Sequence, residues 1–124
     1  MGYIFVDGDR QSAVERVSGC TPIAHQAVAD VVSHAVAGQL LGKQLIYIEA
    51  GSGAKTPVSI DTIRAVRQAI DLPLIVGGGV TSEEQMLAAF SAGANIVVIG
   101  NHFEQHPEDL PRFLQAKHSY VRNN

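Results

Sequence analysis

The stretch "PLIVGGGVTSEEQMLAAFSAGANIVVIGN", residues 73–101, contains one complete strand–helix–strand unit. Two short, β-rich apolar runs, Pro73–Val76 and Ile96–Ile99, enclose a segment that starts at Ser82 and carries two glutamates in its first turn. A serine followed by acids is the usual chemistry of a helix start, so we expect a helix over Ser82–Ala92. Continuous apolar strands separated by a helix indicate a parallel sheet.

The same alternation runs through the rest of the chain. Further strands are predicted at Tyr3–Val6 and Leu45–Glu49, and further helices at Gln26–Leu41, Ser59–Ile70 and Pro107–Lys117. We therefore expect an α/β protein whose four βα units equal the C-terminal half of a TIM (β/α)8 barrel, forming a single half-barrel domain over residues 1–124. A complete barrel needs about 250 residues. A half-barrel would expose two sheet edges and one apolar face, so we expect another chain or a missing half to complete it.

Composition and charge exclude several classes of protein. The 124 residues are 46% hydrophobic and 17% charged, which is typical of a soluble globular domain. The net charge of −3 and the scattered basic residues argue against nucleic-acid binding. No apolar run is long enough to form a transmembrane segment, and no signal peptide is visible. The single cysteine, Cys20, fits a small loop residue in a reducing, cytoplasmic location.

A carboxylate stands at the end of the second predicted strand. In "YIEAGSGA", residues 47–54, Glu49 closes an apolar run and a Gly-Ser-Gly turn follows it. Side chains alternate across a strand, so Tyr47 and Glu49 share one face while the flanking isoleucines share the other. The isoleucines suit the helix-facing side. We therefore expect Tyr47 and Glu49 to point into the barrel near its C-terminal mouth, where active sites of this architecture lie.

Two further predicted strands end in glycine. Three glycines follow the third strand in "IVGGGVTSEE", residues 75–84, and Gly100 with Asn101 ends the fourth. Bare N–H groups beside a helix N-terminus bind anions, so we expect these turns to hold a phosphate. In barrels, the loops after the seventh and eighth strands commonly form a joint phosphate site. On that pairing, the four units are the fifth to eighth of a barrel.

Other features give weaker signals. Asp7 is the only other carboxylate at a strand end, and the long polar loop Asp7–Ile23 has a length often associated with function. Helix Gln26–Leu41 is apolar around most of its circumference, which predicts a subunit contact. The histidines show no metal-ligand spacing, and we expect surface or cap roles for them. They are His25, His34, His102, His106 and His118. The sequence contains neither a Walker A pattern nor a G-x-G-x-x-G fingerprint, so a nucleotide ligand is not indicated.

Four motifs carry a resemblance to a known family. "GYIFVDG", "YIEAGSGA", "PLIVGGGV" and "AGANIVVIGN" resemble the C-terminal half of the geranylgeranylglyceryl phosphate synthases, ether-lipid prenyltransferases of archaea with bacterial relatives. The similarity covers nearly the whole chain, although the three glycines alone would not be specific. The family joins the C3 hydroxyl of sn-glycerol 1-phosphate to a polyprenyl diphosphate, releases pyrophosphate and uses Mg²⁺.

The resemblance implies a set of site residues. The segment that would bind sn-glycerol 1-phosphate consists of Tyr47, Ile48, Glu49, Ala50, Gly51, Ser52 and Gly53. Its phosphate would be held by Gly78, Gly79, Gly100 and Asn101. Glu49, with Tyr47, would be catalytic: the carboxylate would bind the attacking hydroxyl and help to deprotonate it as positive charge develops on the prenyl carbon.

The resemblance also implies what this chain lacks. In the family, the acid that binds Mg²⁺ and a lysine that contacts phosphate come from the N-terminal half, so we expect no metal ligand here. Met1-Gly2-Tyr3 resembles an internal position of the family's sequence, so the natural start could lie upstream. We expect the chain alone to have little or no transferase activity. Its expected partners are sn-glycerol 1-phosphate, a polyprenyl diphosphate, and either further copies in a homo-oligomer or the missing half-barrel.

Two alternatives stay open at this point. The chain could be a half-barrel that binds phosphorylated small molecules without activity. It could also belong to a phospho-sugar isomerase or synthase of the amino-acid biosynthesis barrels, which share paired glycine turns. An isomerase of that kind would want acid/base carboxylates at other strand ends, and only Asp7 is available for that role.

Overall fold

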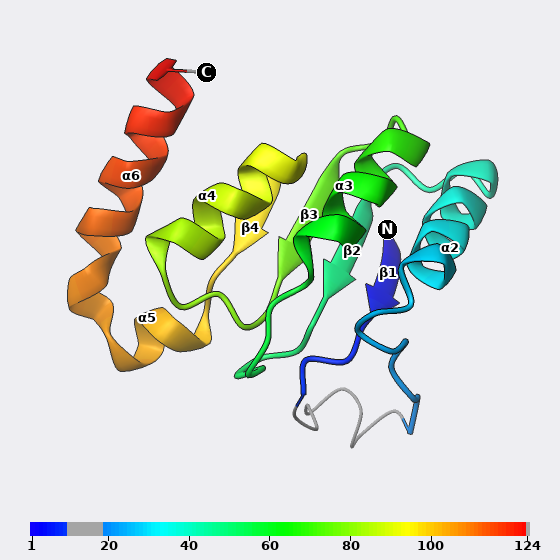
Figure 1. The fold of residues 1–124 in the computed structure, drawn as a ribbon, viewed down its shortest axis with the longest axis horizontal. Coiled ribbons are helices and arrows are strands. Elements are labelled where there is room, and N and C mark those ends of the chain that lie inside the picture. The colour runs from blue at the N-terminus through cyan, green and yellow to red at the C-terminus, as the bar shows by residue number, and fades with distance from the viewer. Residues whose placement is uncertain (10–18, 124) are drawn as a thin grey trace.

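The computed structural model describes residues 1–9 and 19–123, which form a layer of helices on one parallel sheet (Figure 1). The strands lie in the order β1 (Gly2–Phe5), β2 (Ile46–Glu49), β3 (Leu74–Gly77) and β4 (Ile96–Val98). The helices are α2 (Val28–Leu40), α3 (Ile60–Ala69), α4 (Glu83–Ala92), α5 (Asn101–Gln105), the 3-10 turn η1 (Pro107–Asp109) and α6 (Leu110–Asn123). All neighbouring strand pairs are parallel, which confirms the predicted βα units. The predicted loop Asp7–Ile23 lies largely outside the described residues.

Two predicted helices begin at their expected caps. Ser59 Oγ accepts a hydrogen bond from the Thr62 N–H at 3.1 Å, and Ser82 Oγ accepts one from the Gln85 N–H at 3.2 Å. Each serine has extended backbone dihedrals and satisfies an N–H group that has no partner inside the helix.

The C-terminal segment differs from the prediction of one helix over Pro107–Lys117. A short helix, α5, precedes it, and the last helix starts at Leu110 and continues to Asn123. Pro107 explains the break, because it has no N–H for a helical bond and α5 cannot continue through it. The chain instead makes the 3-10 turn η1 before α6 begins.

The main core lies between the sheet and helices α2, α3 and α4. Ile46 and Ile48 of β2 are completely buried there, as are Val31 of α2 and Ile63 of α3. Figure 1 shows these helices side by side along one face of the sheet, with α6 beyond α4. A second, smaller cluster centres on Phe113 and joins α4, α5 and α6.

One arginine ties the N-terminal end of β3 to the helices on either side. Arg67 Nη1 donates to Asn95 Oδ1 at 2.9 Å, and Nη2 donates to the carbonyls of Ile70 at 3.0 Å and Leu72 at 2.7 Å. The same Asn95 oxygen accepts from the Leu74 N–H at 2.9 Å. The guanidinium thus satisfies the carbonyl of Ile70, at the end of α3, and that of Leu72 in the loop that follows.

The opposite face of the sheet is open. Tyr3 is 44% exposed, Ile96 is 50% exposed and Val98 is 39% exposed, and all three point away from the helices. The register pairs Tyr3 with Tyr47, and their ring centroids are 5.6 Å apart. This open face, with the edge strands β1 and β4, agrees with the predicted half-barrel. Within the described part of the chain, no helix has the length and apolarity that crossing a bilayer requires.

Helix α2 covers one end of the helix layer. Val31, Ala35 and Gly38 are buried under it, while Leu40 and the following Leu41 are exposed. The predicted subunit contact on this helix stays a prediction.

Candidate active site

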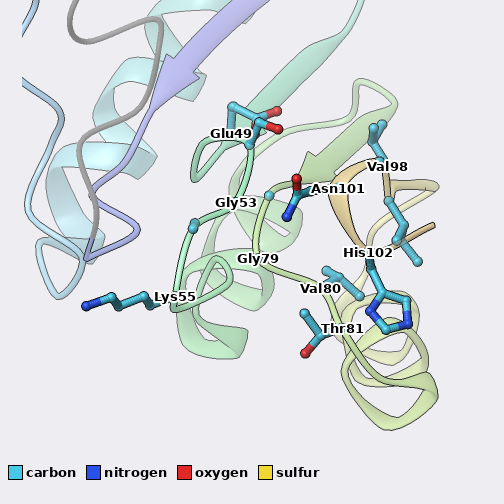
Figure 2. Close-up of a pocket in the computed structure, with 14 residues that line it drawn as sticks. Glu49, Gly53, Lys55, Gly79, Val80, Thr81, Val98, Asn101 and His102 are labelled. Atoms are coloured by element: carbon cyan, nitrogen blue, oxygen red, sulfur yellow. The ribbon is translucent and has the colours of Figure 1, made fainter. Parts of the chain in front are cut away.

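A cavity of about 440 Å³ opens at the C-terminal ends of β2, β3 and β4 (Figure 2). The register places Glu49 beside Gly77 and Gly77 beside Val98, so three strand ends meet at one rim. The lining residues are Glu49, Ser52, Gly53, Ala54, Lys55, Gly78, Gly79, Val80, Thr81, Val98, Ile99, Gly100, Asn101 and His102. The loops after three neighbouring strands therefore line one cavity.

Glu49 is held in a fixed position at this rim. Its Oε1 accepts a hydrogen bond from the Gly51 N–H at 2.8 Å, and the hydroxyl of Tyr47 donates to its carboxylate. Tyr47 and Glu49 lie on the open face of β2, whereas Ile46 and Ile48 face the helices, as predicted from the alternation. The carboxylate keeps further lone pairs for a ligand.

The phenols beside Glu49 keep their protons. Burial, the hydrogen bond to Glu49 and the negative charge of Glu49 together raise the pKa of Tyr47 well above its ordinary value of 10.0. Burial, followed by the charge of Glu49, also raises the pKa of Tyr3. Tyr47 is thus a hydrogen-bond donor that orients the carboxylate, and it is not a base at neutral pH.

The first glycine turn, Gly78–Gly79, follows β3 and requires glycine for steric reasons. Both residues have positive φ, +93° at Gly78 and +75° at Gly79. A Cβ on Gly78 would lie 2.7 Å from the Gly51 nitrogen and 2.8 Å from Glu49 Oε1. The turn therefore packs directly against the loop that holds Glu49.

The second glycine turn, Gly100–Asn101, follows β4 and differs in this respect. Gly100 has a φ of −116°, which any residue adopts, and a Cβ added there would meet no atom within 4 Å. Nothing in the described structure requires glycine at this position. The free space in front of Gly100 belongs to the cavity, where a ligand can approach the backbone closely.

Some predicted site residues do not line the cavity with their side chains. Ile48 and Ala50 are buried on the other side of the strand, and Gly51 acts through its N–H group on Glu49. The remaining predicted residues, Glu49, Ser52, Gly53, Gly78, Gly79, Gly100 and Asn101, are brought together, and Tyr47 supports them from beneath.

Seven lining residues were not predicted from the sequence, and Lys55 and His102 are the two among them with basic side chains. Lys55 lies at the rim with its side chain directed away from the cavity, and His102 lies at the far end from Glu49, beside Val80 and Thr81 (Figure 2). The available signal was their position shortly after the Gly-Ser-Gly turn, for Lys55, and directly after Gly100–Asn101, for His102. The expected surface or cap role is wrong for His102, because its side chain is only 12% exposed and its Nε2 lies 2.9 Å from Asp109 Oδ2.

The described residues do not supply a magnesium site. Residues 1–9 and 19–123 contain no cluster of three or more histidine, cysteine, aspartate or glutamate residues placed to hold a metal. Among them, Glu49 is the only carboxylate that lines the cavity. Mg²⁺ prefers octahedral oxygen coordination, with one or two carboxylates beside substrate phosphates, so its protein ligands would have to come from elsewhere.

Curated relatives that match this chain are longer than it. The chain is 47% identical over 111 residues to the geranylgeranylglyceryl phosphate synthase of Spirosoma linguale, which spans 90% of this chain and 45% of that protein. It is 50% identical over 103 residues to the synthase of Zunongwangia profunda, and the match covers 83% of this chain and 44% of that protein. It is 36% identical over 115 residues to the synthase of Korarchaeum cryptofilum, and the match covers 93% of this chain and 47% of that protein. The chain therefore spans about half the length of the curated relatives it matches.

Solved structures show the same relation. The wild-type synthase from Thermoplasma volcanium superposes with a TM-score of 0.83 at 34% identity, covering 98% of this chain and 48% of that one. The (S)-3-O-geranylgeranylglyceryl phosphate synthase from Thermoplasma acidophilum, in complex with sn-glycerol-1-phosphate, gives a TM-score of 0.74 at 35% identity, with 82% and 43% covered. The PcrB family model matches residues 1–117, and the chain belongs to the PcrB family.

Proposed function

We propose that this chain carries the sn-glycerol 1-phosphate site of a prenyltransferase that attaches a polyprenyl group to the C3 hydroxyl of that substrate. The observation that carries the proposal is that the Glu49 carboxylate and both glycine turns line one cavity. The substrate is a small alcohol with a phosphate at one end and a nucleophilic hydroxyl at the other. Its binding site therefore needs an anion-binding turn and a proton acceptor that are no farther apart than the length of the molecule. The names of the relatives support the choice of substrate.

The glycine turns would hold the phosphate. Main-chain N–H groups in the first and second glycine turns are fixed dipoles, and the first turn leads into the N-terminus of α4. Because these groups are positioned before the ligand arrives, little reorganisation is needed on binding. Because a Cβ at Gly100 would meet no atom within 4 Å, the phosphate has room to approach the main chain there.

Glu49 would act on the other end of the substrate. Its carboxylate accepts the proton of the C3 hydroxyl while the oxygen attacks C1 of the prenyl chain. A carbon–oxygen bond forms at C1, the bond from C1 to the diphosphate breaks, and pyrophosphate leaves with the bonding electron pair. Tyr47 and the Gly51 N–H hold Glu49 in the orientation that this step requires.

The remainder of the site belongs to the same proposal. Polyprenyl diphosphate, and a Mg²⁺ ion to neutralise it, would be held by residues outside those described. These additional residues would approach the site across the open face of the sheet. They would come from a further copy in a homo-oligomer or from the other half of a barrel. We place the reaction in the cytoplasm, since a chain with Cys20 as its single cysteine fits a reducing compartment.

A phospho-sugar isomerase or synthase has less support. Asp7, the other strand-end carboxylate, is exposed and is absent from the residues that line the cavity. Among the residues that the structure describes, Glu49 would then have no second carboxylate in the cavity for acid/base exchange. Phosphate binding without transfer remains the second candidate, because the described residues hold the binding functions and only one catalytic acid.

Calorimetric titration with sn-glycerol 1-phosphate tests the proposal, with sn-glycerol 3-phosphate as the matched ligand control. The chain should bind the first compound more tightly, and Glu49→Gln should weaken binding about fivefold or more, because a charged acceptor for the hydroxyl is lost. Equal affinities for the two enantiomers, or equal binding by chain and variant, would contradict the assignment of Glu49.

A transfer assay with the purified chain tests its completeness. The chain alone should give little or no prenylated product in the presence of Mg²⁺, since the described residues offer no cluster of acidic, histidine or cysteine side chains to hold the ion that would neutralise the diphosphate. Full turnover by the 124-residue chain would show that it holds a complete site.

A further inference from the structure

A series of polar contacts connects the two segments that follow the glycine turns. His102 lies directly after the second glycine turn, and its Nε2 is 2.9 Å from Asp109 Oδ2. The same oxygen lies 3.5 Å from Nη2 of Arg112, and Nε of Arg112 forms an ion pair with Glu83. Glu83 opens α4, shortly beyond the first glycine turn. We call these four residues, His102, Asp109, Arg112 and Glu83, the polar clasp.

The inner part of the polar clasp is shielded from water. The side chains of His102 and Asp109 are 12% and 21% exposed, and Glu83 is 28% exposed. The His102 ring packs 5.5 Å from the Phe113 ring, which is the centre of the second core cluster. A hydrogen bond to a partly buried carboxylate is stronger than one on an open surface, so the contact between His102 and Asp109 can fix a geometry.

A neighbouring histidine provides the contrast. His106 lies 5.1 Å from the His102 ring and pairs with Glu108, but these two side chains are 53% and 68% exposed. His106 does not line the cavity. Each histidine has its own acidic partner, Asp109 for His102 and Glu108 for His106, and of the two only His102 lines the cavity.

We propose that the polar clasp sets the separation of the two glycine turns, with His102 as its main positioning residue. This inference rests on the phosphate binding of the proposed function. The turns end different strands, β3 and β4, and their N–H groups must converge on one anion. Apolar packing holds α4 against α6 without fixing direction, whereas the clasp joins the start of α4 to α5 and α6 through directional bonds. A displaced turn loses its hydrogen bonds to the ligand.

The test combines three variants with nuclear magnetic resonance of the amide groups. His102→Phe keeps an aromatic ring beside Phe113 and removes the donor to Asp109, while His102→Gln keeps a donor. His106→Phe is the matched control. The amide signals of the glycine turns are recorded in the free protein, and inorganic phosphate is then titrated.

His102→Phe should shift the amide signal of Gly79, in the first glycine turn, and weaken phosphate binding about tenfold. His102→Gln should restore most of the affinity, and His106→Phe should change neither reading. Should His102→Phe fail to fold, Arg112→Gln provides the same test, because Arg112 is 60% exposed and joins Asp109 to Glu83. The double variant should lose no more affinity than either single variant, since the residues act in series.

Two negative outcomes can be told apart. Unchanged Gly79 signals and unchanged phosphate affinity in His102→Phe overturn the positioning role and leave His102 as a packing residue. Shifted Gly79 signals in a protein that binds no phosphate would leave the clasp in place and contradict the phosphate site of the proposed function.

Discussion

Gly79 and Gly100 both line the cavity, but they are glycines for different reasons. At Gly79 the backbone is in the left-handed region, and a Cβ would lie 2.9 Å from the Pro57 nitrogen. At Gly100 the backbone is ordinary and a Cβ would enter free space. The first glycine is required by the fold, and the second is best explained by a ligand that approaches the main chain.

Alanine at these two positions should therefore separate stability from binding. Gly79→Ala should lower the free energy of unfolding by about 1–3 kcal/mol, because it places a side chain in a strained region against backbone atoms. Gly100→Ala should change stability by less than about 0.5 kcal/mol. It should weaken phosphate binding about tenfold, as the methyl group blocks access to the amides. Denaturant unfolding and phosphate titration measure both, and a stable Gly79→Ala variant would contradict the steric argument.

Tyr47 gives the protein a sensitivity to alkali. Its pKa is raised in the folded state, first by burial and then by Glu49, so the folded state holds the phenolic proton more tightly than the unfolded chain. Its contribution to stability is complete below about pH 10 and is lost as the pH rises above that value. The urea midpoint of the chain should fall between pH 9 and pH 11 more steeply than that of Tyr47→Phe. Parallel pH profiles for the two proteins would contradict this role.

Among the secondary-structure elements, those with local signals were predictable. The serine caps of α3 and α4 lie where the sequence places them, and alternation along β2 assigns Glu49 to the open face. The short helix α5 has neither a side-chain cap bond nor a buried residue, so it left no apolar pattern to detect. The role of His102 depends on Asp109 after a proline turn, a contact that only the tertiary fold creates.

Arg67 is an element-scale feature that no local pattern revealed, because its acceptors come from the end of α3 and the starts of β3 and β4. Arg67→Ala should lower the free energy of unfolding by about 2 kcal/mol, since several carbonyls lose a charged donor. Phosphate binding should not change, because the clamp lies at the opposite end of the strands from the cavity.

Arg64→Ala is the matched control for this measurement. Arg64 lies on the same helix and pairs with Asp61 at 3.6 Å, with both side chains largely exposed. Arg64→Ala should lower the free energy of unfolding by less than about 1 kcal/mol. Equal effects of the two substitutions in denaturant unfolding would contradict the assignment of Arg67 as a structural clamp.

At the scale of the whole molecule, the open face is the dominant feature. A sheet with apolar side chains on an exposed face and an exposed edge strand tends to associate with another surface. Tyr3 lies at one edge and Ile96 at the other, and the last helix adds Leu110 and Leu114, which are 42% and 47% exposed. The open face is the expected contact surface for a second chain.

Lysine at the edge should reduce this association. Light scattering of the chain should give a mass above that of one copy, and Ile96→Lys should lower it, because a charge on an edge strand opposes pairing. Gln68→Lys, on the exposed side of α3, adds the same charge away from the open face and should leave the mass unchanged. A monomeric chain at all concentrations would contradict self-association.

The pairing of Tyr3 with Tyr47 on the open face has a practical consequence. The chain contains three tyrosines and no tryptophan, so its ultraviolet emission comes from a very small set of rings. Two of these rings lie together on the surface that a partner would cover. Association of a partner with the open face can therefore be followed by intrinsic tyrosine fluorescence, without a label. Comparison with Tyr3→Phe shows how much of the change in emission comes from Tyr3.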